Sequence, residues 1–190
     1  MKLPVLVQAL VFTVVTLPVQ QVLAAEAMTH MSGSFAGWRQ IGTANWRIEN
    51  DEFVADMGNG HLVTEVDYQD FHITAEFWVN EGANSGIFLR ASNKDEIRDT
   101  NAYEANIYDN RPDQSGRTGG LVNFAAPTTV INTPDKWSTY DITVQGDHIV
   151  IKLNGVTTVD IHDATYASGP ISLQYGAGTV KFRNVMIGKL

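Results

Sequence analysis

The feature that most constrains this chain is the alternation of apolar and polar side chains along short segments. The clearest case is Phe71–Val79, where five apolar residues alternate with His72, Thr74, Glu76 and Trp78. A period of two sends neighbouring side chains to opposite faces of a β-sheet. About a dozen such segments follow one another, separated by turns, and no segment has the periodicity of an amphipathic helix. The pattern predicts an all-β fold, an antiparallel sandwich or barrel.

The turns between these segments carry the residues that tight turns require. Asn154-Gly155 is the strongest of these signals, because a type I′ hairpin turn needs positive φ at both central positions. The predicted strands are 35–41, 46–55, 61–64, 71–79, 84–90, 103–109, 121–124, 137–145, 148–153, 156–161, 171–175 and 180–187.

The net charge and the cysteine content of the chain exclude several kinds of partner and site. The 190 residues carry 21 acidic and 13 basic side chains, a net charge of −8, and contain no cysteine. The length fits one domain. An acidic chain does not suit a nucleic-acid partner, whose phosphates require a basic face. The absence of cysteine excludes disulfides, a catalytic thiolate, Cys-ligated zinc and a lipidated N-terminal cysteine.

The first residues resemble a secretory signal peptide. Lys2 is followed by the mostly apolar stretch 3–19, and Val22-Leu23-Ala24 offers a small-residue cleavage pattern, with Ala25 as an alternative end point. A membrane anchor is the competing interpretation, but this run is shorter than the roughly 20 apolar residues that span a bilayer. We therefore expect a signal peptide at 1–24, a polar lead-in at 25–34 and one domain at 35–190. The mature protein is expected to be periplasmic or secreted and not membrane-bound.

Two strands bring a group of polar side chains together. Alternation places Arg90 on one face of 84–90 together with Phe88, and Glu104 and Asn106 on one face of 103–109 together with Tyr108. The other faces carry Ile87 and Leu89 in the first strand, and Tyr103, Ala105 and Ile107 in the second. If the two strands pair, a cation, a carboxylate and an amide meet on one face of a sheet, as an acid/base or sugar-binding site requires. The alternative is a solvated sheet face with an ordinary ion pair, worth about 0.2–1 kcal/mol.

These segments also stand in the order of a known pattern. Its motifs are, in order, Asn84-Ser85-Gly86-Ile87 with Arg90, Tyr103-Glu104 with Ile107 and Asp109, Thr118-Gly119-Gly120, Trp137, Leu153-Asn154-Gly155, Ile171-Ser172-Leu173-Gln174 and Val180–Val185. On these motifs the chain resembles the 3-keto-disaccharide hydrolase domain family, formerly domain of unknown function 1080, over nearly all of the mature sequence.

The resemblance implies a concanavalin A-like jelly roll with a polar concave face and a carbohydrate substrate, often a glucoside oxidised at carbon 3. It carries over Arg90, Glu104 and Asp109 as pocket residues, with Asn84 and Ser85 shaping the turn before them. Four positions depart from the family pattern, which usually has Gln, Asn, Gly and His where this chain has Asn106, Ser138, Ser172 and Tyr175. Because an imidazole is missing at Tyr175, a non-catalytic, lectin-like carbohydrate-binding domain is the alternative function.

The chemistry expected of a 3-keto glucoside is elimination followed by addition of water. A base removes the acidified proton on carbon 2, and a cation stabilises the enolate oxygen. We expect Glu104 to be the base and Arg90 the stabilising cation, with Asp109 either protonating the leaving oxygen or orienting Arg90. A conventional glycosidase would instead need two carboxyl groups about 5–5.5 or 6.5–9.5 Å apart.

The remaining candidates contact substrate or serve the fold. Asn84, Ser85, Asn106, Trp78 and Tyr175 are the expected substrate-binding residues, with Trp78 stacking on a sugar ring. No cofactor is expected, because the five histidines lack metal-ligand spacing and the Asp and Asn of 109–113 suit a turn better than a calcium site, although neither excludes a divalent metal. The other tryptophans, at 38, 46 and 137, are expected in the core.

Overall fold

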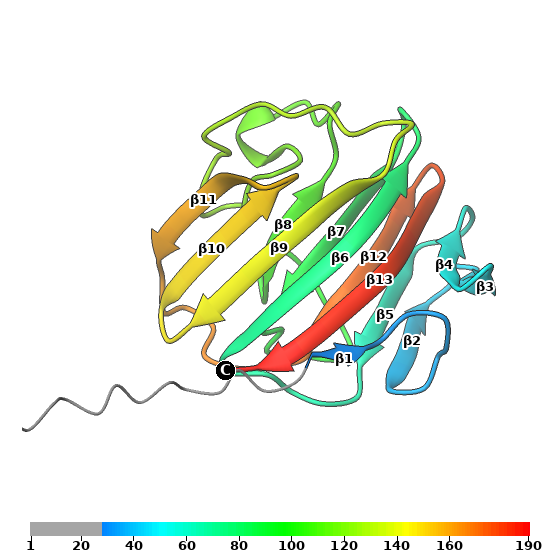
Figure 1. Cartoon of the computed structure of the whole chain (residues 1–190), viewed down its shortest axis with the longest axis horizontal. Coiled ribbons are helices and arrows are strands. Elements are labelled where there is room, and N and C mark those ends of the chain that lie inside the picture. Colours follow the sequence, from blue (N-terminus) through cyan, green and yellow to red (C-terminus); the bar gives the residue numbers. More distant parts are fainter. Residues whose placement is uncertain (1–27) are drawn as a thin grey trace, which may run out of the picture.

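A computed structural model describes residues 28–190, and the predicted signal peptide lies outside these described residues. Thirteen strands and one 3₁₀ turn make up the regular structure (Figure 1). The strands are β1 Thr29–His30, β2 Trp38–Gly42, β3 Arg47–Glu49, β4 Glu52–Ala55, β5 Gly60–Thr64, β6 Phe71–Val79, β7 Asn84–Leu89, β8 Tyr103–Ile107, β9 Ser138–Gln145, β10 His148–Leu153, β11 Val156–His162, β12 Ser172–Ala177 and β13 Val180–Lys189; the turn η1 is Gln114–Gly116.

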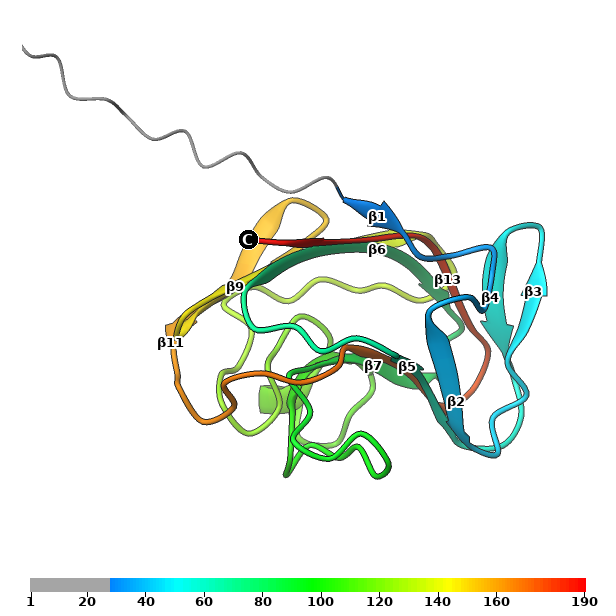
Figure 2. The same ribbon diagram turned by 90° about the horizontal axis from the view of Figure 1, so that it is seen from below.

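The strands form two antiparallel sheets, as the alternation predicts. One sheet has eight strands in the order β11-β10-β9-β6-β13-β4-β3, with β1 also paired to β13, and the other has five in the order β2-β5-β12-β7-β8. Figure 2 shows the eight-stranded sheet arching over the five-stranded one. The all-β jelly-roll sandwich is therefore confirmed.

The core lies between the two sheets. β6 alternates strictly between buried and partly buried residues, and its five apolar side chains join a cluster to which both sheets contribute. Each fully buried large apolar side chain stabilises such a core by about 1.5–3 kcal/mol. Trp38 and Trp46 belong to this cluster, as expected, but Trp137 does not: it is only partly buried, and the Arg183 guanidinium lies 3.8 Å from its ring centroid.

The turn chemistry is confirmed at the β10–β11 hairpin, where φ is 51° at Asn154 and 80° at Gly155. Two strand predictions need correction. The predicted strand 46–55 is a hairpin of β3 and β4, because Asn50 and Asp51 both adopt positive φ. The predicted strand 121–124 forms only isolated bridges at Leu121.

The N-terminal lead-in contributes structure of its own, since β1 pairs with β13 through Thr29↔Ile187. Within residues 28–190, no helix is long and apolar enough to cross a membrane.

Candidate functional site

Strands β7 and β8 pair, as the proposed site requires. Phe88 lies opposite Glu104, and Gly86 lies opposite Asn106. Ile87 and Leu89 point into the core, so these four residues occupy the outer face of the five-stranded sheet. The predicted facing of Glu104 and Asn106 is therefore observed.

Strands β5 and β12 extend this face with residues distant in sequence. The register aligns His61 with Gln174, and Gln174 with Gly86. A pocket of about 400 Å³ lies over this part of the sheet. Its lining residues are Asn59, His61, Asn84, Phe88, Ile97, Arg98, Asp99, Glu104, Arg111 and Gln174.

Glu104 is the most perturbed carboxyl group of this pocket. Its side chain forms no hydrogen bond with any residue of the described chain, and the residue is 6% exposed. Burial raises the pKa of Glu104 to about 8, and the negative charge of Asp99 adds to the rise, while Arg111 opposes it. A carboxyl group titrating near neutral pH is suited to proton transfer.

His61 faces the same pocket from β5. Its Nδ1 lies 3.1 Å from Ser172 Oγ, and its ring meets the Phe88 ring edge-on with centroids 5.1 Å apart. Burial lowers the pKa of His61 to about 4, so the imidazole is neutral at pH 7. A neutral imidazole held at one nitrogen can exchange a hydrogen bond with a ligand through the other.

The loop between β7 and β8 closes one side of the pocket. Ile97 packs with Phe88 and Val63 in a second hydrophobic cluster outside the main core. Arg39 on β2 holds the loop through a 2.8 Å bond to the Lys94 carbonyl and a 2.9 Å ion pair with Asp95. The loop that carries Arg98 and Asp99 is therefore anchored onto the sheet.

Arg90 does not line this pocket, and the predicted facing of its side chain is wrong. β7 ends at Leu89, and Arg90 adopts a φ of 53°, which breaks the alternation that predicted its facing. Its guanidinium is 1% exposed and donates to three backbone carbonyls, those of Gln69, Gly146 and Tyr166, with Asp70 at 3.2 Å. Arg90 holds loops together.

Asp109 also serves the fold. Its side chain is 7% exposed, accepts hydrogen bonds from Thr133 N at 2.8 Å and Oγ1 at 2.9 Å, and pairs with Arg117 at 3.5 Å. It borders a different pocket from Glu104. Asp109 is five residues from Glu104, on the opposite parity of the strand, and the turn after the end of β8 at Ile107 does not bring its side chain to the Glu104 pocket.

The five predicted substrate-binding residues divide between two roles. Asn84 lines the pocket, and the Asn106 side chain is fully buried beneath it, donating from Nδ2 to the Gly116 carbonyl. Ser85 and Tyr175 lie on the opposite side of their strands: Ser85 Oγ donates to the Gln174 carbonyl at 2.6 Å, and the Tyr175 ring is part of the core. Neither faces the pocket.

Trp78 lies on the wrong sheet to contact the same ligand. It is on the outer face of the eight-stranded sheet, with Lys181 Nζ 5.6 Å from its ring centroid. Trp78 therefore faces outward, as the alternation predicts, but the core separates the outer faces of the two sheets, so Trp78 and Glu104 do not share a site.

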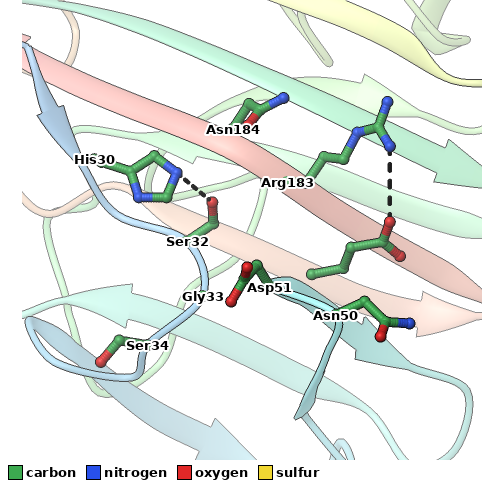
Figure 3. Close-up of a pocket in the computed structure, with 9 residues that line it drawn as sticks. His30, Ser32, Gly33, Ser34, Asn50, Asp51, Arg183 and Asn184 are labelled. Atoms are coloured by element: carbon green, nitrogen blue, oxygen red, sulfur yellow. Dashed lines mark hydrogen bonds and ion pairs between the residues drawn. The ribbon is translucent and has the colours of Figure 1, made fainter.

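A larger pocket, of about 540 Å³, lies at the other sheet, between the lead-in, the β3–β4 turn and β13 (Figure 3). Its arginine is already partnered: Arg183 pairs with Glu76 at 2.8 Å and with Glu52 at 3.8 Å. His30, Asn50 and the other polar residues around it are mostly exposed. The Glu104 pocket is the better candidate because Glu104 and His61 are buried there and burial shifts the pKa of each.

Of the pocket residues, only Glu104 and Asn84 were predicted from the sequence, and those that it missed include His61, Gln174 and Arg111. Alternation alone places Gln174 on the opposite face of its strand from Leu173 and Tyr175, so the sequence contained the information that Gln174 points away from the core. His61 joins the site only because β5 pairs with β12, more than 100 residues away. Arg111 comes from the loop after β8. Among the residues described, no cluster of three or more acidic or histidine side chains is arranged to hold a metal ion.

Comparisons with known proteins agree with this architecture. A family model described as the 3-keto-alpha-glucoside-1,2-lyase-like domain matches residues 30–188. A candidate glycosyl hydrolase from Parabacteroides distasonis superposes with a TM-score of 0.79 at 18% identity, covering 92% of this chain and 98% of its own. The carbohydrate-binding module CBM66 from Bacillus subtilis gives a TM-score of 0.65 at 18% identity over 80% and 96% of the two chains. These identities show a shared fold. No curated protein matches the sequence.

Proposed function

Because the chain belongs to the 3-keto-alpha-glucoside-1,2-lyase-like domain family, we propose that it cleaves the glycosidic bond of 3-keto glucosides or 3-keto disaccharides. The reaction takes place in the pocket on the outer face of the five-stranded sheet, and Glu104 is the base. The observation that carries this proposal is the buried Glu104 carboxyl, whose pKa is raised to about 8 in a polar pocket.

The proposed first step is a proton transfer. The ketone on carbon 3 acidifies the hydrogen on carbon 2, and the Glu104 carboxylate removes it, leaving the electron pair as an enolate. The enolate re-forms its carbonyl, a double bond forms between carbons 1 and 2, and the bond from carbon 1 to the leaving oxygen breaks. Glu104 then returns the proton to that oxygen. Addition of water across the double bond completes a net hydrolysis.

Arg111 and His61 replace Arg90 in this scheme. Enolate charge needs a cation or a hydrogen-bond donor near the ketone oxygen. Arg111 lines the pocket, and its positive charge lowers the pKa of Glu104. The guanidinium is therefore close enough to stabilise negative charge that develops on a substrate in the pocket. Neutral His61 supplies an imidazole from β5, on the same face of the sheet as Gln174.

The test is a turnover assay with variants. Purified protein is incubated with 3-keto-trehalose, 3-keto-glucosides and their unoxidised parents, with and without divalent metal, and products are followed by mass spectrometry. We expect cleavage of the keto sugars only, and a loss of at least about 100-fold in Glu104→Gln, the scale of a lost general base. Glu65→Gln, on an exposed residue away from the pocket, is the control and should retain full activity. Full activity in Glu104→Gln would refute the role of Glu104.

A lectin-like carbohydrate-binding function is the second candidate. It is favoured by the departure from histidine at Tyr175 and by the presence of a carbohydrate-binding module among the proteins that share the fold. Saturable sugar binding without turnover would support it. Cleavage of unoxidised sugars would instead indicate a conventional glycosidase in which Asp99 supplies the second carboxyl group.

We also propose that the protein acts in the periplasm or outside the cell. The signal-peptide pattern of residues 1–24 supports this location. Size and N-terminal sequence of the exported protein, measured by mass spectrometry, test both the location and the cleavage site at Ala24 or Ala25.

A further inference from the structure

Glu104 lies directly against a glycine of the neighbouring strand. A Cβ atom added at Gly86 would be 3.0 Å from Glu104 Oε1, 3.2 Å from its Cγ and 3.4 Å from the Ala105 carbonyl oxygen. Contacts of 3.0–3.4 Å are tighter than nearly all that real Cβ atoms make, so an alanine here would displace the glutamate. The Glu104 side chain lies as close to Gly86 as it does because position 86 has no Cβ.

Backbone conformation does not explain this glycine. Ten glycines of the described chain have positive φ, and Gly86 is not one of them. It sits inside a regular strand, opposite Asn106 in the β7–β8 register. A glycine within a strand weakens it and often marks a close approach of another group. Here the approaching group is the side chain of Glu104.

We propose that Gly86 is a positioning residue, whose missing side chain lets the Glu104 carboxyl lie on the floor of the pocket across β7. As an account of catalysis this inference rests on the function proposed above, but the placement of Glu104 can be measured without turnover.

The placement has a chemical consequence. Lying across Gly86, the Glu104 carboxyl is screened from water, which is the first cause of its raised pKa. The charged and titratable groups that face it across the pocket are Asp99, Arg98, Arg111 and His61. A Cβ at position 86 would force the carboxyl to move by a few tenths of an ångström away from the floor and toward the solvent side of the pocket.

The experiment compares Gly86→Ala with Gly82→Ala. Gly82 is a matched control because it is exposed, is not among the glycines with positive φ, and has no atom within 4 Å of an added Cβ. The titration midpoint of Glu104 is measured by carboxyl-carbon NMR, assigned by its disappearance in Glu104→Gln. We expect the midpoint to fall by at least about one pH unit in Gly86→Ala and to stay unchanged in Gly82→Ala. An unchanged midpoint in folded Gly86→Ala would overturn the inference.

Turnover of a 3-keto glucoside separates the inference from the proposed function. In Gly86→Ala we expect kcat to fall at least about tenfold with a smaller change in KM, as for a misplaced base. If the parent protein shows no turnover but the midpoint still moves, the proposed reaction fails and the positioning role stands.

A second variant guards against a Gly86→Ala protein that does not fold. If the clash with Glu104 is the cause, shortening that side chain in Gly86→Ala/Glu104→Ala should restore folding, as monitored by thermal unfolding. A double variant that also fails to fold would show that the glycine is needed for another reason, and would overturn the inference.

Discussion

Replacing Glu104 with glutamine should make the protein more stable at alkaline pH, even as it removes the proposed base. The folded state holds Glu104 with a pKa of about 8, against 4.5 for the unperturbed group. Between these two pH values the folded protein binds a proton that the unfolded chain does not. The free energy of unfolding therefore falls as pH rises through this window. Glutamine has the same shape and never ionises, so it escapes this loss.

The magnitude follows from the size of the shift. Each pKa unit corresponds to about 1.4 kcal/mol, so the shift of Glu104 sets an upper bound of about 5 kcal/mol. Relaxation of the pocket around the ionised carboxylate reduces this figure, and we expect a gain of about 2–4 kcal/mol. The gain should be absent near pH 4.5, grow with pH and level off above pH 8.

The assay is urea unfolding of the parent protein, Glu104→Gln and the exposed control Glu65→Gln, at intervals from pH 4.5 to 9. The free energy of unfolding of each variant is compared with that of the parent at the same pH, because the titration of His61 changes the stability of both proteins with pH in the opposite direction. Its pKa is about 4 in the folded state against 6.5 for the free group, so its contribution to stability rises with pH across that range. This contribution cancels when Glu104→Gln is compared with its parent.

The reasoning would be refuted by a difference between Glu104→Gln and the parent that stays constant within about 0.5 kcal/mol from pH 5 to 9, the usual scale of a surface substitution. Such a result would mean that Glu104 is not buried in solution. The Glu65→Gln control should show a flat difference.

Three further outcomes follow from the same structure. The kcat/KM of keto-sugar cleavage should rise about tenfold per pH unit below pH 8 and then level off, because the base must be ionised; a pH–rate profile that falls over this range contradicts a base role for Glu104. Arg90→Ala should lower the free energy of unfolding by about 2–4 kcal/mol, since it removes a buried guanidinium that donates to the carbonyls of Gln69, Gly146 and Tyr166 and pairs with Asp70, and a melting temperature within a degree of the parent contradicts its structural role. Asp109→Asn should cost about 1–3 kcal/mol by weakening the contacts to Thr133 and Arg117; it should leave the pH–rate midpoint in place, whereas a shifted midpoint would return Asp109 to the catalytic group.

The facing of residues within a strand could be read from the sequence. Period-two alternation correctly assigned Phe71–Val79 to a half-buried strand, and it placed Glu104 and Asn106 away from the core. The same rule held in β12, where it turns Tyr175 inward and Gln174 outward, and applying it there would have identified the pocket residue. Such facing depends only on the local backbone, because successive side chains of an extended chain must point to opposite sides.

The folded structure decided where side chains beyond the strand ends point, and which residues lie side by side on neighbouring strands. Arg90 and Asp109 follow the last residues of β7 and β8, where a positive φ or a turn ends the alternation and nearby carbonyls or hydroxyls capture the side chain. His61 and Gln174 meet Glu104 because β5, β12, β7 and β8 are neighbours in one sheet. Strand order arises from the packing of the whole core, which no local pattern encodes. The alternation in the sequence therefore determined which face Glu104 occupies, and the packing of distant strands determined which residues share that face.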